Sequence, residues 1–381
     1  MRFFCCILLA FFVMDVPNVI AISPPAGLVD DVRSAILMEK SSGQVLMESN
    51  ADQRLPIASV TKTMTMLLAV EALYAGVVAR DSMITVSAFA ASMGGSQVFL
   101  QEGEQMRFDD IFKAIVIASA NDASVALAEH LAGSEEAFVA QMNARAAELG
   151  MANTHFINCN GLDDGTEAFS SARDVALMSR ELLKHPAAIE FMSIWMDSLR
   201  GGEFELVNTN RLVRFYEGAT GLKTGSTDAA LYCLAASAMR GDMHLIAVVL
   251  GAATSPIRFA TATGMLDYGF ANYAVFEAGL DGDALPEVVV SKGTLERIGV
   301  VRAGGSGVVV PKAKANSVVA TMDLPSSVRA PIAEGERIGV VVYTIDGEVV
   351  ATVDLVAMAG AERIGFWRFW MRLMEDFVVM R

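Results

Sequence analysis

Residues 59–74 have the sequence SVTKTMTMLLAVEALY. Apolar side chains recur at helical spacing, and no Gly or Pro interrupts 60–74, so a helix is predicted here. Ser59 stands at its start and Lys62 follows three residues later, which places the two side chains on one face. A hydroxyl and an amine can therefore meet on the first turn. The alternative is that Ser59 only caps the helix.

Strand and helix signals alternate around this stretch. Residues 34–39 and 44–48 flank Lys40-Ser-Ser-Gly43, which predicts a β-hairpin with a short turn. Helical spacing returns at 108–118 and continues at 124–131.

Two buried strands are expected further along, at 231–236 and 245–250, on either side of Arg240-Gly-Asp. Together with the earlier elements they predict an α/β mixture around one sheet. We expect this first domain to span 24–282.

The sequence changes character over 285–358. Short Val and Ile runs, such as Gly307-Val-Val-Val and Arg337-Ile-Gly-Val-Val-Val-Tyr, are separated by Gly, Pro, Asn and Asp. This pattern predicts a small all-β domain.

The last segment, 361–381, is expected to form an amphipathic helix. Arg368, Arg372, Glu375 and Asp376 project opposite the apolar arc, and Arg363 falls inside it. The arc consists of Ile364, Phe366, Trp367, Phe369, Trp370, Met371, Leu373, Met374, Phe377 and Val378. Its aromatic pairs and terminal position favour a membrane surface, and packing on the protein itself is the alternative.

Residues 1–21 are predicted to be a signal peptide. An apolar stretch, Phe3 to Val13, precedes Val19-Ile20-Ala21, whose small final residue suits cleavage. A buried first helix is the alternative. Cleavage would leave Cys159 and Cys233 as the remaining cysteines, and the sequence does not decide whether they pair.

Charge and hydrophobicity limit the classes of partner. Of 381 residues, 53% are hydrophobic, and the net charge is -15. No internal run approaches about 18 consecutive apolar residues, so a spanning helix is not expected. The negative charge argues against nucleic acid, whose phosphates require Lys and Arg.

Three short motifs occur in a fixed order: Ser59-Val-Thr-Lys62, Ser119-Ala-Asn121 and Lys223-Thr-Gly225. Each is weak alone, because Ser59 could be a cap, Ser119-Ala-Asn121 a helix terminus and Lys223-Thr-Gly225 a turn. Their combination points to nucleophilic catalysis.

A serine hydroxyl becomes a good nucleophile when a nearby base removes its proton. Lys62 can act as that base only when its amine is neutral. Burial and a second cation both disfavour the ammonium form, and Lys223 is the candidate cation if the sheet places it opposite.

The other motif residues suit supporting roles. Ser119 can relay a proton to a leaving amine, and the Asn121 amide can position Lys62 or a substrate carbonyl. Gly225 leaves room for an extended substrate beside its strand. The backbone N–H groups of Ser59 and Ser226 are candidates for an oxyanion hole.

This motif set resembles that of penicillin-binding proteins and class A β-lactamases. Within that group the chain is most similar to low-molecular-weight D-alanyl-D-alanine carboxypeptidases. The resemblance extends over nearly the whole chain. It includes Arg54-Leu-Pro-Ile-Ala-Ser59, Ser119-Ala-Asn-Asp-Ala, Asn153-Thr-His-Phe, Asn160-Gly-Leu-Asp, Ser170-Ser-Ala-Arg-Asp and Asn208-Thr-Asn-Arg.

The resemblance implies a β-lactamase-like α/β (α+β) catalytic domain whose antiparallel sheet is covered by helices, then a β-rich domain and a membrane-associating C-terminal helix. It implies a serine D-Ala-D-Ala carboxypeptidase that trims peptidoglycan stem peptides through an acyl-Ser59 intermediate. β-Lactam antibiotics would acylate the same residue. The protein would act outside the cytoplasm, in the periplasm or at the outer face of the cytoplasmic membrane.

The resemblance also assigns substrate contacts. Thr224 and Arg258 would bind the terminal carboxylate of the peptide, and an arginine fork suits a carboxylate. An ordinary surface arginine is the alternative for Arg258. The chain departs from the family at Leu231, where Gly is frequent, at Ser226, where a basic or aromatic-type side chain is frequent, and around Gly94-Gly-Ser96, where the loop is short.

Other chemistries find no support in the sequence. His130, His155, His185 and His244 belong to no HExxH motif or metal-type spacing, so no metal site and no cofactor are expected. No GxSxG motif is present for an α/β-hydrolase triad.

Two other functions stay open. A β-lactamase of class A would carry an ExxLN element, which is not evident between Asn121 and Lys223. A catalytically silent penicillin-binding, membrane-associated cell-wall protein would keep the fold, but all three motifs are intact.

Overall fold

The computed structural model describes residues 24–162, 168–277, 285–303, 307–365 and 370. They fall into two compact units, one that ends at Val275 and one that begins at Phe276. The expected signal peptide, 1–21, lies outside the described residues. The expected domain limits, 24–282 and 285–358, stay predictions.

An antiparallel five-stranded sheet organises the first unit, and its strand order is β2-β1-β9-β8-β7. The strands are β1 Ser34–Glu39, β2 Val45–Ser49, β7 Ala219–Thr227, β8 Leu231–Arg240 and β9 Met243–Ala252. The predicted hairpin is confirmed, because β1 and β2 pair with Met38 opposite Val45. The two predicted buried strands are confirmed as β8 and β9.

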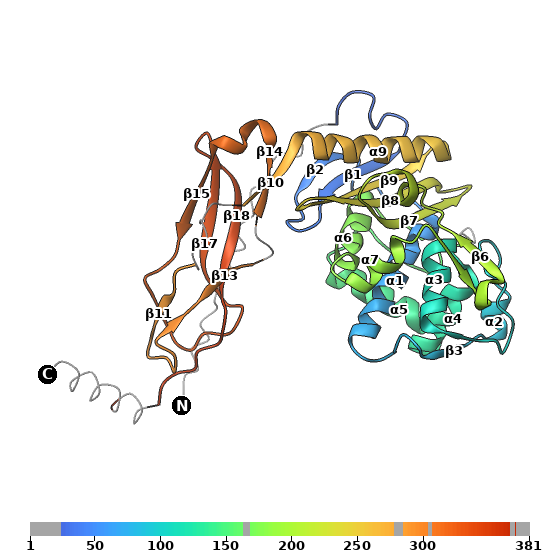
Figure 1. The fold of residues 1–381 in the computed structure, drawn as a ribbon, viewed down its shortest axis with the longest axis horizontal. Helices are drawn as coiled ribbons and strands as arrows, with labels where there is room; N and C mark the ends of the chain where they lie inside the picture. Colours follow the sequence, from blue (N-terminus) through green and yellow to red (C-terminus); the bar gives the residue numbers. More distant parts are fainter. Residues whose placement is uncertain (1–23, 163–167, 278–284, 304–306, 366–369, 371–381) are drawn as a thin grey trace, which may run out of the picture. The chain divides into compact units, whose positions relative to one another are not determined.

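Helices cover both faces of this sheet (Figure 1). α9 lies along one face, against β8 and β9, and α1, α6 and α7 lie on the other. Every residue of β9 is buried, as expected for a central strand between two helical layers.

Helices and short turns account for most of the remaining chain in this unit. The helices are α1 Lys62–Tyr74, α2 Ala88–Ala91, α3 Phe108–Ala118, α4 Asn121–Ala132, α5 Glu135–Glu148, α6 Ala172–Leu182, α7 Pro186–Met192, α8 Leu212–Phe215 and α9 Ser255–Asn272, with 3-10 turns η1 Ala58–Thr61 and η2 Arg200–Gly202. Two small hairpins pair β3 Met83–Thr85 with β4 Gln105–Arg107, and β5 Met196–Leu199 with β6 Phe204–Val207. β10 Tyr273–Glu277 crosses the boundary between the units.

The first helix begins later than its apolar pattern suggests. Residues 58–61 form the 3-10 turn η1, and the α-helix starts at Lys62. Val60 N donates to Ile57 O over three residues, and Ala58 takes a left-handed backbone with φ of 50°. The sequence pattern misses this turn, because 3-10 and α-helical periods differ little over four residues.

The second unit is β-rich, as predicted. A three-stranded sheet has the order β12-β11-β16, and a four-stranded sheet has the order β13-β18-β17-β15. The elements are β11 Val288–Ser291, β12 Arg297–Ile298, β13 Val300–Arg302, β14 Gly307–Pro311, η3 Lys312–Ser317, β15 Val318–Asp323, β16 Ser327–Arg329, β17 Arg337–Ile345 and β18 Glu348–Ala357. Tyr343 and Leu355 are fully buried in its core.

The expected helix over 361–381 does not include its first residues. Ala361 pairs with Ile332 and Arg363 pairs with Gly293 in antiparallel bridges, so backbone hydrogen bonding holds 361–365 in an extended form. Beyond Gly365 only Trp370 is described, and it is helical. Within the described ranges, no helix has both the length and the apolarity needed to cross a membrane.

Candidate functional site

Ser59 and Lys62 lie at the junction of η1 and α1. Ser59 is half-buried in the 3-10 turn, and Lys62 is completely buried as the first residue of the α-helix. The Lys62 amine lies 2.9 Å from the Ser59 hydroxyl oxygen. The structure thus brings together the hydroxyl and the amine that the SxxK spacing predicts.

Two further oxygens surround the Lys62 amine. Lys62 Nζ lies 2.6 Å from Asn121 Oδ1 and 2.6 Å from the Asn160 carbonyl oxygen. Both oxygens can only accept hydrogen bonds, whereas a hydroxyl can donate or accept. An ammonium would donate to all three oxygens, whereas a neutral amine can give its two N–H bonds to the two obligate acceptors and accept from the Ser59 O–H group.

Burial lowers the pKa of Lys62 to about 7, against the weaker opposing effects of Cys159 and Asp122. At neutral pH a substantial fraction of the amine is therefore unprotonated. Of the two expected causes, burial is the one that lowers the pKa of Lys62. Burial also lowers the pKa of Lys223, and repulsion from Lys62 and Arg258 lowers it further.

Asn121 opens α4 just after Ser119, which ends α3 in the left-handed region with φ of 63°. Asn121 Nδ2 donates to the Gly94 carbonyl at 2.8 Å, and Asn121 N donates to the Ser96 carbonyl at 2.7 Å. Ser119 is 4% exposed. Among the described residues, no hydrogen bond joins its hydroxyl to either lysine.

Strand β7 forms one of the two edges of the sheet. It carries Lys223, Thr224 and Gly225. Lys223 is fully buried, and its amine donates to the Thr224 carbonyl at 3.0 Å. An edge strand has unpaired backbone groups, so an extended peptide can add to it.

Gly225 also has a structural reason to lack a side chain. A Cβ atom there would lie 2.7 Å from the Ile57 carbonyl oxygen and 2.9 Å from the Ser59 nitrogen. The missing side chain therefore lets β7 approach the turn that carries Ser59.

Arg258 lies in the first turn of α9 and is 8% exposed. Its Nη1 donates to the carbonyls of Gly225 at 3.0 Å and Cys233 at 3.1 Å. The guanidinium also lies over the ring of Phe259. No described carboxylate pairs with this buried cation, and its Nε has no partner. The surface-arginine alternative is therefore wrong.

Ser226 and Leu231 lie near the turn between β7 and β8. Ser226 is exposed and stands opposite Tyr232 in the register. Leu231 takes a left-handed backbone with φ of 56°, where glycine is favoured. This conformation explains why a glycine at this position, as the family frequently has, suits the turn.

Sequence reasoning missed three contributors to the site. The Asn160 carbonyl contacts Lys62, and Gly161 lies so close to η1 that an added Cβ would be 2.0 Å from the Ala58 carbonyl oxygen. Thr209 accepts a hydrogen bond from the Thr224 hydroxyl at 2.7 Å. In the sequence these residues fall within the family-like segments Asn160-Gly-Leu-Asp and Asn208-Thr-Asn-Arg, to which no role was assigned.

The remaining cysteines and histidines lie elsewhere. Cys159 and Cys233 are buried and unpaired. His244 bonds Thr220 within the sheet, and His155 pairs with Phe169 through its backbone. Within the described residues, no group of three or more His, Cys, Asp or Glu side chains lies close enough to hold a metal ion.

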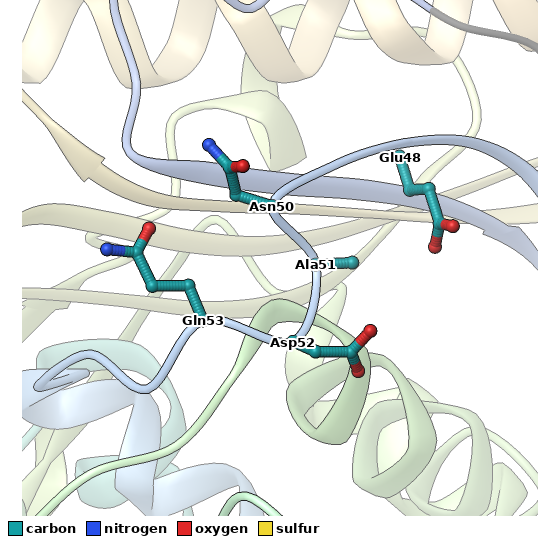
Figure 2. Close-up of a pocket in the computed structure, with 5 residues that line it drawn as sticks. All are labelled: Glu48, Asn50, Ala51, Asp52 and Gln53. Carbon is teal, nitrogen blue, oxygen red and sulfur yellow. The ribbon is translucent and has the colours of Figure 1, made fainter.

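A separate hollow of about 560 Å³ lies at the turn after β2 and shares no lining residue with this site. Its walls are Glu48, Asn50, Ala51, Asp52 and Gln53 (Figure 2). Arg173 forms ion pairs with both carboxylates of this wall, so each already has a cationic partner.

Comparison with known proteins identifies the family. Residues 22–254 match the family model described as D-alanyl-D-alanine carboxypeptidase. The chain belongs to this family. Residues 276–363 match a second model, described as penicillin-binding protein 5, C-terminal domain.

Relatives match over almost the full length. D-alanyl-D-alanine carboxypeptidase DacF of Bacillus subtilis (strain 168) is 42% identical over 353 residues, which cover 92% of this chain and 90% of that protein. DacC of Escherichia coli (strain K12) is 34% identical over 92% of this chain and 88% of its own length.

Solved structures of penicillin-binding proteins are similar to this chain in fold. Penicillin binding protein 5 from Haemophilus influenzae matches with a TM-score of 0.78 and 32% identity, over 90% of this chain and 100% of that one. Penicillin-binding protein D2 from Listeria monocytogenes, in its ampicillin-bound form, matches with a TM-score of 0.59 and 33% identity, over 65% of this chain and 100% of that one. The predicted architecture, a penicillin-binding α/β domain followed by a β-rich domain, is confirmed. The carboxypeptidase is a penicillin-binding serine peptidase that acts on peptidoglycan.

Proposed function

We propose that Ser59 is the nucleophile of this carboxypeptidase and that neutral Lys62 is its base. The complete burial of Lys62, which lowers its pKa to about 7, supports this assignment best together with its contacts: a neutral amine can give its two N–H bonds to the two obligate acceptors and keep its lone pair for the Ser59 proton. A base 2.9 Å from a hydroxyl is within the reach that proton transfer requires.

The reaction then has two halves. Ser59 Oγ attacks the carbonyl carbon between the two terminal D-alanines, its proton moves to Lys62 Nζ, and a C–O bond forms. The C–N bond breaks as Ser119 passes a proton to the departing D-Ala amine, and Ser119 takes back the proton held by Lys62, so that both side chains are neutral again. Water then attacks the acyl-Ser59 ester, which restores the hydroxyl and releases the shortened stem peptide. In this second half Lys62 takes a proton from water and passes it to the Ser59 oxygen.

Buried positive charge supports recognition of the terminal carboxylate. Lys223 and Arg258 are both buried, and neither has an acidic partner among the described residues. A buried charge without a partner is unfavourable, so an anionic ligand stabilises this arrangement. Thr224 stands on β7 between Lys223 and Gly225, whose carbonyl accepts a hydrogen bond from Arg258, and its hydroxyl is available to the same group.

Backbone N–H groups complete the site. The Ser59 and Ser226 amides flank Gly225, the point of close approach between η1 and β7. Two donors placed on either side of the attacked carbonyl would hold the oxyanion.

We also propose that residues 1–21 direct export. A helix after Gly365 would bind peripherally to the outer face of the cytoplasmic membrane. The apolar arc and its aromatic pairs support the second point. Truncation after Gly365, which keeps the bridges of Ala361 and Arg363, should release the protein from vesicles without loss of activity. Continued vesicle binding by the truncated protein would contradict the anchor.

One experiment tests the catalytic proposal. The wild-type protein and Ser59→Ala are incubated with a fluorescent penicillin and, separately, with diacetyl-Lys-D-Ala-D-Ala. We expect labelling and D-Ala release from the wild type and neither from the variant. Rapid loss of label with antibiotic hydrolysis would indicate a β-lactamase, and absence of labelling would indicate a silent binding protein.

A further inference from the structure

The Thr224 hydroxyl is engaged by a neighbouring side chain. It donates to Thr209 Oγ1 at 2.7 Å, and within the described residues this is the one side-chain hydrogen bond of either hydroxyl. Thr224 is 5% exposed. Thr209 therefore controls how this hydroxyl points.

Thr209 itself is held in place by buried polar groups. Its backbone N–H donates to the Ile117 carbonyl at 3.2 Å, near the end of α3. The Asn208 side chain donates to the Ile194 carbonyl at 2.8 Å and accepts from Asn210 N at 2.9 Å. Asn210 is fully buried. The segment between β6 and α8 thus presents the Thr209 hydroxyl at a fixed position.

A carboxylate can only accept hydrogen bonds. To bind one, Thr224 must turn its O–H bond away from Thr209 and toward the ligand. The Thr224 oxygen then has a free lone pair, and the unused Thr209 proton can be donated to it. A hydroxyl that accepts one hydrogen bond while it donates another is polarised and donates more strongly.

We propose that Thr209 is a positioning residue for carboxylate recognition, which acts by reversing its hydrogen bond with Thr224 when substrate binds. This inference rests on the proposed function, in which Thr224 contacts the terminal carboxylate. Thr209 touches no reacting atom. Its removal should weaken the binding of substrates that carry the carboxylate and leave the chemistry at Ser59 intact.

The test compares Thr209→Val, which has the same shape without the hydroxyl, with Thr209→Ser, which keeps it. Each is assayed with diacetyl-Lys-D-Ala-D-Ala and with the methyl ester of the same peptide, at matched folding as judged by thermal unfolding. We expect Thr209→Val to raise KM for the free acid about three- to tenfold, the range of one net hydrogen bond, with kcat changed little. The ester should be affected less, and Thr209→Ser should behave like the wild type.

A double-mutant cycle with Thr224→Val separates positioning from general disturbance. If Thr209 acts through Thr224, Thr209→Val has no further effect on KM in the Thr224→Val background. Equal losses with acid and ester, full additivity in the cycle, or no loss at all would overturn the inference. If the wild-type protein itself releases no D-Ala, the proposed function is wrong, and this inference, which rests on it, is wrong as well.

Discussion

Asn121 Oδ1 lies 2.6 Å from the Lys62 amine, and the other end of the same amide donates to the Gly94 carbonyl at 2.8 Å. Because a carbonyl can only accept, Nδ2 must face Gly94 and Oδ1 must face Lys62. The loop at Gly94 therefore fixes a neutral acceptor beside the base. A neutral acceptor leaves the low pKa of Lys62 intact.

Asn121→Asp should raise the pKa of Lys62, because a carboxylate at this distance favours the ammonium form by about 1 to 3 pKa units. We expect penicillin acylation at pH 7 to fall about tenfold or more and to recover as the pH is raised. The measurement is the acylation rate from pH 6 to pH 10. Asn121→Leu, which removes the acceptor without adding charge, should show no upward shift, and an unshifted Asn121→Asp profile would contradict the account.

The wild-type acylation rate should rise with pH and reach half of its maximum where Lys62 loses its proton, at about pH 7. The sign follows from the role of the amine: the protonated form has no lone pair for Ser59, so activity is lost as the pH falls. Stopped-flow acylation with a chromogenic cephalosporin checks this, with circular dichroism to confirm folding at each pH. An acylation rate that does not change between pH 5.5 and 9 would contradict the neutral-base mechanism.

Gly225→Ala should disrupt the site. The added methyl group would meet the Ile57 carbonyl and the Ser59 amide, and a displacement of about 1 Å can lower a rate about a hundredfold. The acylation rate of the purified variant is the readout. Gly365→Ala is a suitable control, because nothing lies within 4 Å of its added Cβ. Near-normal acylation of Gly225→Ala would mean that β7 and η1 can separate without harm.

The pairing of Ser59 with Lys62 could be predicted from the sequence, because residues three apart on a helix share a face whatever the rest of the fold does. The β1–β2 hairpin and α3 were also predictable from local sequence. Their apolar periods and turn residues are local signals that the tertiary structure did not override.

Other parts of the site depend on contacts that carry no local signal. The Asn160 acceptor is a backbone carbonyl, so no side-chain type marks it. The Thr209–Thr224 contact joins a loop to an edge strand. The close approach at Gly225 and the burial that lowers the pKa of Lys62 exist only once the sheet and helices have packed.

His244 should make folding sensitive to acid. Burial, aided by Lys40, lowers its pKa to about 4. The unfolded chain takes up a proton below about pH 6.5 and the folded protein only below about pH 4, so stability falls as the pH drops through this window. We expect a loss of about 3 kcal/mol from this group.

Urea unfolding at pH 7, 5.5 and 4.5 measures this loss. His244→Gln, which can still bond Thr220 but does not titrate, should show a smaller drop in the free energy of unfolding over the same range. Equal drops in both proteins would show that other groups carry the acid sensitivity.

The most direct test of the central claim is the position of the covalent adduct. The protein is treated with penicillin at pH 8, digested and mapped by mass spectrometry. We predict one penicilloyl group, on Ser59, and none in Lys62→Ala at the same exposure time. An adduct on Ser119 or another residue, or full acylation of Lys62→Ala, would contradict the assignment of Ser59 as nucleophile and Lys62 as its base.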